Sequence, residues 1–145
     1  MGELPAHRPG DVTVLDMEAS IEHLTRGTVR NVDALLVVAE PYYRSLETTG
    51  RLVPLARELG LERIWIVANK VRDDRDEAAI REYCARRGFE VIGVVPFDEN
   101  VGEADRLGRA LIDHMPTAAA VLALEEVADR LVERLGPAAS VATSQ

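Results

Sequence analysis

The chain contains 145 residues, of which 47% are hydrophobic and 29% are charged. This length and composition fit one folded domain with a buried core and exclude a disordered linker. The 17 basic and 25 acidic side chains give a net charge of −8, which argues against DNA or RNA as a partner. Cys84 is the only cysteine, so no internal disulfide can form, and the lack of a secretory or membrane-spanning apolar run predicts a cytoplasmic protein.

The two ends of the chain lack periodic hydrophobic patterns. Residues 1–10 contain two prolines and two glycines, and residues 136–145 are mostly small or polar. Such compositions are typical of irregular or frayed segments. We therefore expect an irregular N-terminal segment over 1–10, a single α/β domain over 11–135 and a flexible tail over 136–145.

Four short runs rich in β-branched residues are apolar at consecutive positions. This pattern is typical of strands that are covered on both faces of a parallel sheet. The runs are Val12–Asp16, Ala34–Glu40, Ile64–Asn69 and Glu90–Pro96.

Segments with a helical spacing of apolar residues separate the last three runs. Ser45–Leu59 and Asp74–Arg87 are each followed directly by a glycine, which favours a left-handed C-cap. Two further helices are expected over Ala104–His114 and Ala118–Leu135. The alternation of strand and helix predicts right-handed βαβ units, and hence a parallel sheet with flanking helices.

Polar residues follow the predicted strands at the edge where open α/β sheets bind ligands. Asp16 ends the first strand, and a carboxylate at this position can hold a water of a magnesium shell. Asn69 ends the third strand, and its amide can donate to and accept from a purine edge. Both residue types also end strands and cap helices without any further role.

The sequence contains no phosphate-binding loop of the form G-x-x-x-x-G-K-[ST], and no G-x-G-x-x-G. The only lysine, Lys70, lies in the run ANKV without a neighbouring glycine. The cradle of backbone amides and lysine that holds nucleotide phosphates is therefore absent from these residues.

Three runs between residues 11 and 115 occur in the order of a known family: VLDMEAS, ANKVRD and VPFDENVGEADRLGRAL. They resemble the C-terminal half of the CooC-type ATPases, which are MinD/ArsA-like deviant P-loop proteins associated with nickel insertion into carbon monoxide dehydrogenase. The resemblance implies a partial P-loop NTPase fold of the SIMIBI, MinD-like type that lacks its phosphate-loop half.

The resemblance also implies roles for individual residues, with ATP or ADP and Mg²⁺ as cofactors. Asp16 corresponds to the switch II aspartate, an indirect magnesium ligand, and the N–H of Ser20 would face a phosphate. Asn69 corresponds to the purine-contacting asparagine, and the segment from Pro96 lines the adenine pocket. The implied cofactor-binding residues are Asp16, Ser20, Asn69, Lys70, Pro96, Phe97 and Asp98.

Two functions follow as hypotheses. In the first, the chain is the switch II and purine side of an ATP-binding protein for metallocentre assembly. It would not hydrolyse ATP alone, because the phosphate cradle is absent. In the second, it is a non-enzymatic interaction or dimerisation module with a degenerate NTPase fold. Expected partners are a second copy or a complementary P-loop-bearing chain, which would cover an exposed sheet edge, and a metalloenzyme such as carbon monoxide dehydrogenase.

Overall fold

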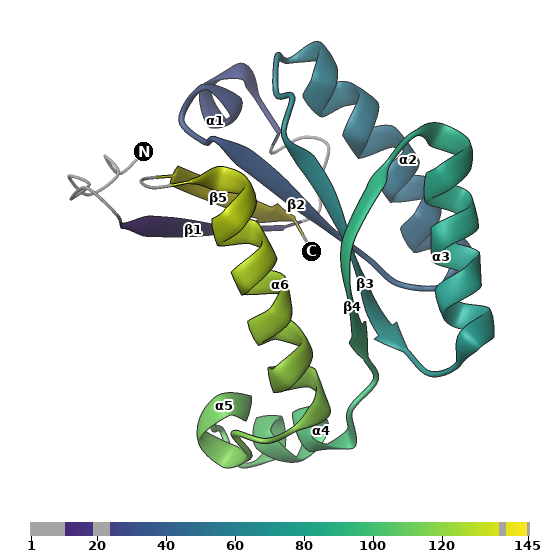
Figure 1. The fold of residues 1–145 in the computed structure, drawn as a ribbon, viewed down its shortest axis with the longest axis vertical. Coiled ribbons are helices and arrows are strands. Elements are labelled where there is room, and N and C mark those ends of the chain that lie inside the picture. Colours follow the sequence, from purple (N-terminus) through teal and green to yellow (C-terminus); the bar gives the residue numbers. More distant parts are fainter. Residues whose placement is uncertain (1–10, 19–23, 137–138, 145) are drawn as a thin grey trace.

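The computed structural model describes residues 11–18, 24–136 and 139–144. Its strands form one five-stranded sheet in the order β1-β5-β2-β3-β4, and every neighbouring pair is parallel (Figure 1). The predicted parallel α/β architecture is therefore confirmed. The strands are β1 Val12–Met17, β2 Ala34–Ala39, β3 Ile64–Val71, β4 Glu90–Pro96 and β5 Ala139–Ser144.

Helices cover both faces of the sheet. On one face, α1 (Arg26–Arg30), α2 (Tyr43–Glu58) and α3 (Asp74–Arg87) enclose the alternate residues Leu35, Val37, Ile66 and Ala68 of the central strands. On the other face, α6 (Ala119–Leu135) packs on Leu36, Trp65, Val67 and Ile92. Successive residues of β2 and β3 are thus buried on opposite faces, as consecutive apolar runs predict. None of the described helices has an apolar stretch long enough to cross a bilayer.

Local signals fix the ends of α3. Asp73 caps its start, where the carboxylate accepts from the N–H of Asp76 at 3.0 Å. Gly88 ends it with a φ of 68°, in the left-handed region that a residue without a side chain adopts at little cost. The observed bounds of α3 are the predicted ones.

The helix expected over Ala104–His114 is wrong, because this part of the chain forms two helices, α4 (Glu99–Arg106) and α5 (Leu111–His114). Asp98 caps α4 and accepts from the N–H of Asn100, so the helix begins five residues before the expected start. Gly108 has a φ of 62°, which no α-helix continues through.

The expected flexible tail over 136–145 is also wrong, because Ala139–Ser144 form β5, an interior strand of the sheet between β1 and β2. Thr143 pairs with Asp16 on one side and with Leu36 on the other. A strand flanked on both sides satisfies its N–H and C=O groups through the ladders. Small and polar residues can therefore form a strand that their composition does not signal.

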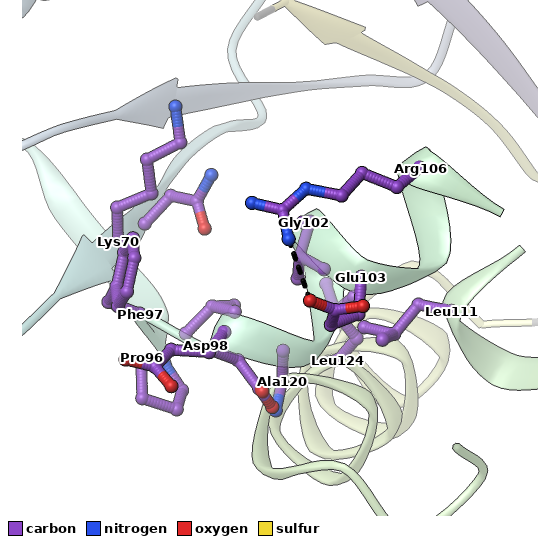
Figure 2. A pocket seen from close by; sticks show the side chains of 14 residues that line it. Lys70, Pro96, Phe97, Asp98, Gly102, Glu103, Arg106, Leu111, Ala120 and Leu124 are labelled. Carbon is purple, nitrogen blue, oxygen red and sulfur yellow. Dashed lines mark hydrogen bonds and ion pairs between the residues drawn. The ribbon is translucent and has the colours of Figure 1, made fainter. Parts of the chain in front are cut away.

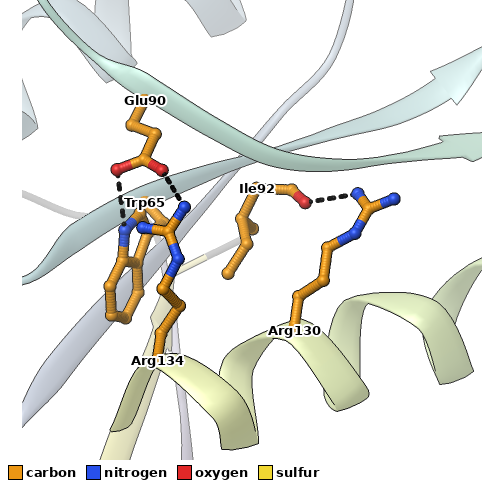
Figure 3. Close-up of polar contacts among 5 residues, drawn as sticks. All are labelled: Trp65, Glu90, Ile92, Arg130 and Arg134. Atoms are coloured by element: carbon orange, nitrogen blue, oxygen red, sulfur yellow. Dashed lines mark hydrogen bonds and ion pairs between the residues drawn. The ribbon is translucent and has the colours of Figure 1, made fainter.

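The two outer strands differ in how they are covered. Two arginines of α6 reach β4 (Figure 3): Arg130 donates to the carbonyl of Ile92 at 2.8 Å, and Arg134 pairs with Glu90 at 2.6 Å. Glu90 also accepts from the indole N–H of Trp65 at 3.1 Å. On β1, by contrast, Val14 is 61% exposed, and no described strand pairs with its outer side. The position of β1 at the end of the sheet agrees with the exposed sheet edge that we expected.

Candidate functional site

The parallel order brings the ends of β3 and β4 side by side at the carboxyl edge of the sheet. Asn69 and Pro96 lie there and line one cavity of about 710 Å³. The backbone of the two strand ends is joined, since the N–H of Phe97 donates to the carbonyl of Val71 at 2.9 Å. Residues that the sequence places 27 positions apart (96 − 69) are therefore brought to one site.

The cavity has one wall from strand ends and one from α4 (Figure 2). Lys70 and Phe97 stand on the first wall, and Gly102 and Arg106 on the second. Apolar side chains make up much of the lining: Val95, Pro96, Phe97, Val101, Leu111 and Leu124. A flat apolar ligand with a polar edge fits such a surface better than a free anion does.

Lys70 has an unusual backbone conformation and a side chain that forms an ion pair. Its φ is 55°, and it lies where the register between β3 and β4 shifts, between Ala68 and Val71. Its ammonium pairs with Glu40, which follows β2, at 2.5 Å. A left-handed conformation is costly for a residue with a side chain, so the bulge is held by its surroundings. The result is a lysine that spans the gap between the ends of β3 and β2.

The ring of Phe97 stacks against Arg72, a residue that no sequence motif indicated. The guanidinium carbon of Arg72 lies 3.8 Å from the centroid of the Phe97 ring, a close cation–π contact. The ring is still 40% exposed and lines the cavity.

The carboxylate of Asp98 is occupied by helix capping. One oxygen accepts from the backbone N–H and side-chain amide of Asn100 at 2.9 and 2.7 Å, and the other from the N–H of Ala120 at 3.1 Å. These bonds, that from Ala120 first, lower the pKa of Asp98 below its ordinary value. Asp98 therefore ties the start of α4 to the start of α6 and shapes the cavity floor.

Asp16 lies neither in this cavity nor at the edge of the sheet where Asn69 lies. Through Thr143 and Leu36 it is level with Trp65, the second residue of β3. It lines a separate depression with Leu15, Met17, Glu18 and Thr28. Because β5 and β2 lie between β1 and β3, Asp16 is separated from Asn69 by three strand spacings, roughly 14 Å, and also by four residues along the strand direction, roughly 13 Å. Ser20 lies outside the described residues. The part of the chain that the structure describes holds no group of three or more metal-ligating side chains.

Comparisons with known proteins agree with this geometry. No protein-family model matches the chain. It is 37% identical over 135 residues to the carbon monoxide dehydrogenase accessory protein CooC of Rhodospirillum rubrum, covering 90% of this chain and 48% of that protein. It is 41% identical over 101 residues to an ATP-binding protein of Methanocaldococcus jannaschii, covering 70% of this chain and 39% of that protein.

Solved structures give the same result for the fold. A ParA family ATPase from Chlorobium tepidum matches with a TM-score of 0.62 and 24% identity, over 77% of this chain and 46% of that one. The MinD protein of Pyrococcus horikoshii, solved in complex with Mg-ADP, matches with a TM-score of 0.59 and 21% identity. The match covers 72% of this chain and 43% of that one. The chain spans about half the length of the curated relatives it matches. It belongs to the CooC-type, MinD-like ATPases and corresponds to a part of their fold.

Proposed function

We propose that this chain forms the purine side of an adenine nucleotide site in an ATP-binding protein. The observation that carries the proposal is the convergence of Asn69, Pro96 and Phe97, from two adjacent strand ends, on one largely apolar cavity. The description of a relative as ATP-binding and the Mg-ADP bound to a MinD structure support the choice of ligand.

Each part of the site has a task in this proposal. The apolar wall takes the base, and the Asn69 amide hydrogen-bonds its polar edge. Lys70 and Arg106 stand at the rim as cations, each paired with a glutamate, Glu40 and Glu103 respectively.

The family resemblance, and not the position of Asp16 relative to the cavity, assigns this carboxylate to the magnesium ion that accompanies the phosphates. A lone carboxylate fits this role, because Mg²⁺ keeps several waters and needs few protein ligands. The ion would neutralise phosphate charge when bound. Since no phosphate loop is present in these residues, the chain by itself binds nucleotide weakly and does not hydrolyse it.

The phosphate loop comes from a complementary chain in this proposal. A P-loop follows a strand, and a strand added in parallel beside β1 would place its loop at the edge that holds Asp16. Val12 and Val14, 42% and 61% exposed, offer that strand and its helix an apolar surface. The relative described as a carbon monoxide dehydrogenase accessory protein supports a role of the complex toward such a metalloenzyme.

A non-enzymatic interaction module is the second candidate. The exposed valines of β1 favour it equally, because a second copy could cover them as well. The two candidates differ in one respect, since only the first requires the cavity to bind a nucleotide.

The test fills the cavity without disturbing the fold. Gly102 lines the cavity from α4, has nothing within 4 Å of the place of a β-carbon, and has no positive φ. A leucine there projects into open space and also favours the helix. We expect Gly102→Leu to weaken ADP binding at least about tenfold, or ~1.4 kcal/mol, in a calorimetric titration.

Ala79→Leu is the matched control, because Ala79 is exposed on α3, which packs on the opposite face of the sheet. It should leave ADP binding unchanged. If both variants bind ADP as the parent chain does, the cavity is not the nucleotide site. If the parent chain binds none and elutes as a dimer in light scattering, the second candidate stands.

A further inference from the structure

β5 stands between two strands that follow one another along the chain. β1 leads through α1 to β2, yet these two strands are not neighbours in the sheet, because β5 pairs with β1 on one side and with β2 on the other (Figure 1). No other described strand pairs with β1. The sheet therefore has a slot between β1 and β2 that is one strand wide, and β5 fills it.

The composition of β5 suits this slot poorly. An interior strand of a parallel sheet is covered on both faces and is usually rich in Val, Ile and Leu, whereas β5 reads ASVATS. Its last residue, Ser144, lies in register between Met17 and Val37, which both belong to the apolar core on the α2 side of the sheet. Ser144 is only 4% exposed, so a hydroxyl is buried at a position that favours an apolar side chain.

A cavity of about 360 Å³ adjoins Ser144. Val37 of β2 and Leu52 of α2 line it as well, so the slot is incompletely filled at this end. The pairing of β5 is also uneven, since it covers six residues of β1 but four of β2. A strand with a larger apolar residue at the position of Ser144 would form the same backbone ladders and bury more apolar surface.

We infer that the slot between β1 and β2 is the docking site for an apolar, parallel β-strand of a complementary chain, and that β5 is a replaceable strand that occupies the slot until this partner binds. The chain spans about half the length of its curated relatives, so a partner that supplies the rest of such a fold has strands to offer. This rests on the complementary chain of the proposed function and names the side of β1 on which its strand lies. It does not require the cavity at Asn69 to bind a nucleotide.

Native-state hydrogen exchange of the full chain, without nucleotide, tests whether β5 is replaceable. The amides of β1 and β5 should exchange together and at least about 100-fold faster than those of β3, after correction for intrinsic rates, because they open without global unfolding. Ser144→Val removes the buried hydroxyl and adds apolar contact, so it should slow the exchange of β5 about 5- to 10-fold. Thr117→Val, in the exposed turn before α6, is the matched control and should leave that exchange unchanged.

A labelled peptide tests whether the slot accepts a foreign strand. The probe carries the β5 sequence with valine at its last two positions, ASVAVV, behind a lysine-rich solubility tag and a fluorophore. Thr143→Pro removes an N–H from an interior strand and so weakens β5. In fluorescence anisotropy this variant should bind the probe at least about tenfold more tightly than the parent chain does. A probe with proline at its third position, ASPAVV, should not bind.

Four results would overturn the inference. Amides of β5 that exchange no faster than those of β3 would show that β5 is a permanent strand, and unchanged exchange in Ser144→Val would show that the slot does not favour an apolar residue. A folded Thr143→Pro that binds the probe no better than the parent chain would show that the slot takes no foreign strand. Exchange of β5 that slows as the parent chain dimerises would assign the slot to the β5 of a second copy. A failure to bind ADP would leave all these measurements unchanged, so the nucleotide site and the strand slot fail separately.

Discussion

Asp98 is predicted to stabilise the fold by capping two helices at once. Its carboxylate accepts from the N–H of Asn100 in α4 and from the N–H of Ala120 in α6. The N-cap residue of α6, Ala118, has no side-chain cap of its own. A helix cap contributes about 1 kcal/mol, so replacing Asp98 by alanine removes two caps and costs about 2 kcal/mol. For a domain of this size that loss lowers Tm by about 4–8 °C.

The assay is urea unfolding followed by circular dichroism, with Asp129→Ala on the exposed face of α6 as the control. The pKa of Asp98 is lowered in the folded state from an ordinary 3.8. The stability that the ionised Asp98 contributes is therefore fully present above pH 3.8, and it is lost as the pH falls through the lower pKa that Asp98 has in the folded state. The difference in the free energy of unfolding between the parent chain and Asp98→Ala should be constant near pH 7 and should shrink below pH 3.8. A difference under about 0.5 kcal/mol at pH 7 would refute the double cap.

Three other substitutions test the packing and charge of the same framework. Gly93→Ala places a β-carbon against the Val127 side chain of α6, closer than van der Waals contact allows. The substitution should therefore destabilise the domain by about 1–3 kcal/mol in urea unfolding; an unchanged midpoint would mean that α6 shifts to make room. Arg134→Ala removes the hydrogen bond that chiefly lowers the pKa of Glu90 from its ordinary 4.5. That pKa should rise in an NMR titration, and the stability that Glu90 contributes above pH 4.5 should be lost; an unmoved pKa would contradict the contact. Lys70→Gly should be more stable than Lys70→Ala by about 1 kcal/mol, because only glycine relieves the φ of 55°; equal stabilities would contradict a strained bulge.

The regular part of the fold could be predicted because its signals are local. The acidic cap at Asp73 and the glycine at Gly88 fix α3 within the sequence itself, and the apolar run Glu90–Pro96 coincides with β4. β5 could not be predicted, because its six residues gain their place from the backbone pairing of β1 and β2 on either side. The brief α1 gave no periodic signal over its five residues.

The site was predictable in outline for a similar reason. Asn69 and Pro96 were expected together, because parallel neighbouring strands end at one edge. The Arg72–Phe97 stack and the Lys70–Glu40 pair were not expected, since both are side-chain contacts between segments that no sequence pattern links. The roles of Asp16 and Ser20 toward a nucleotide stay predictions.

The most direct test of the account is an NMR titration of the labelled chain with ADP and Mg²⁺. The account predicts that the backbone amides of Asn69, Phe97 and Gly102 shift together with one dissociation constant, while those of α3 stay in place. Saturating ADP that moves none of these three amides, or moves chiefly those of α2 and α3, would contradict it.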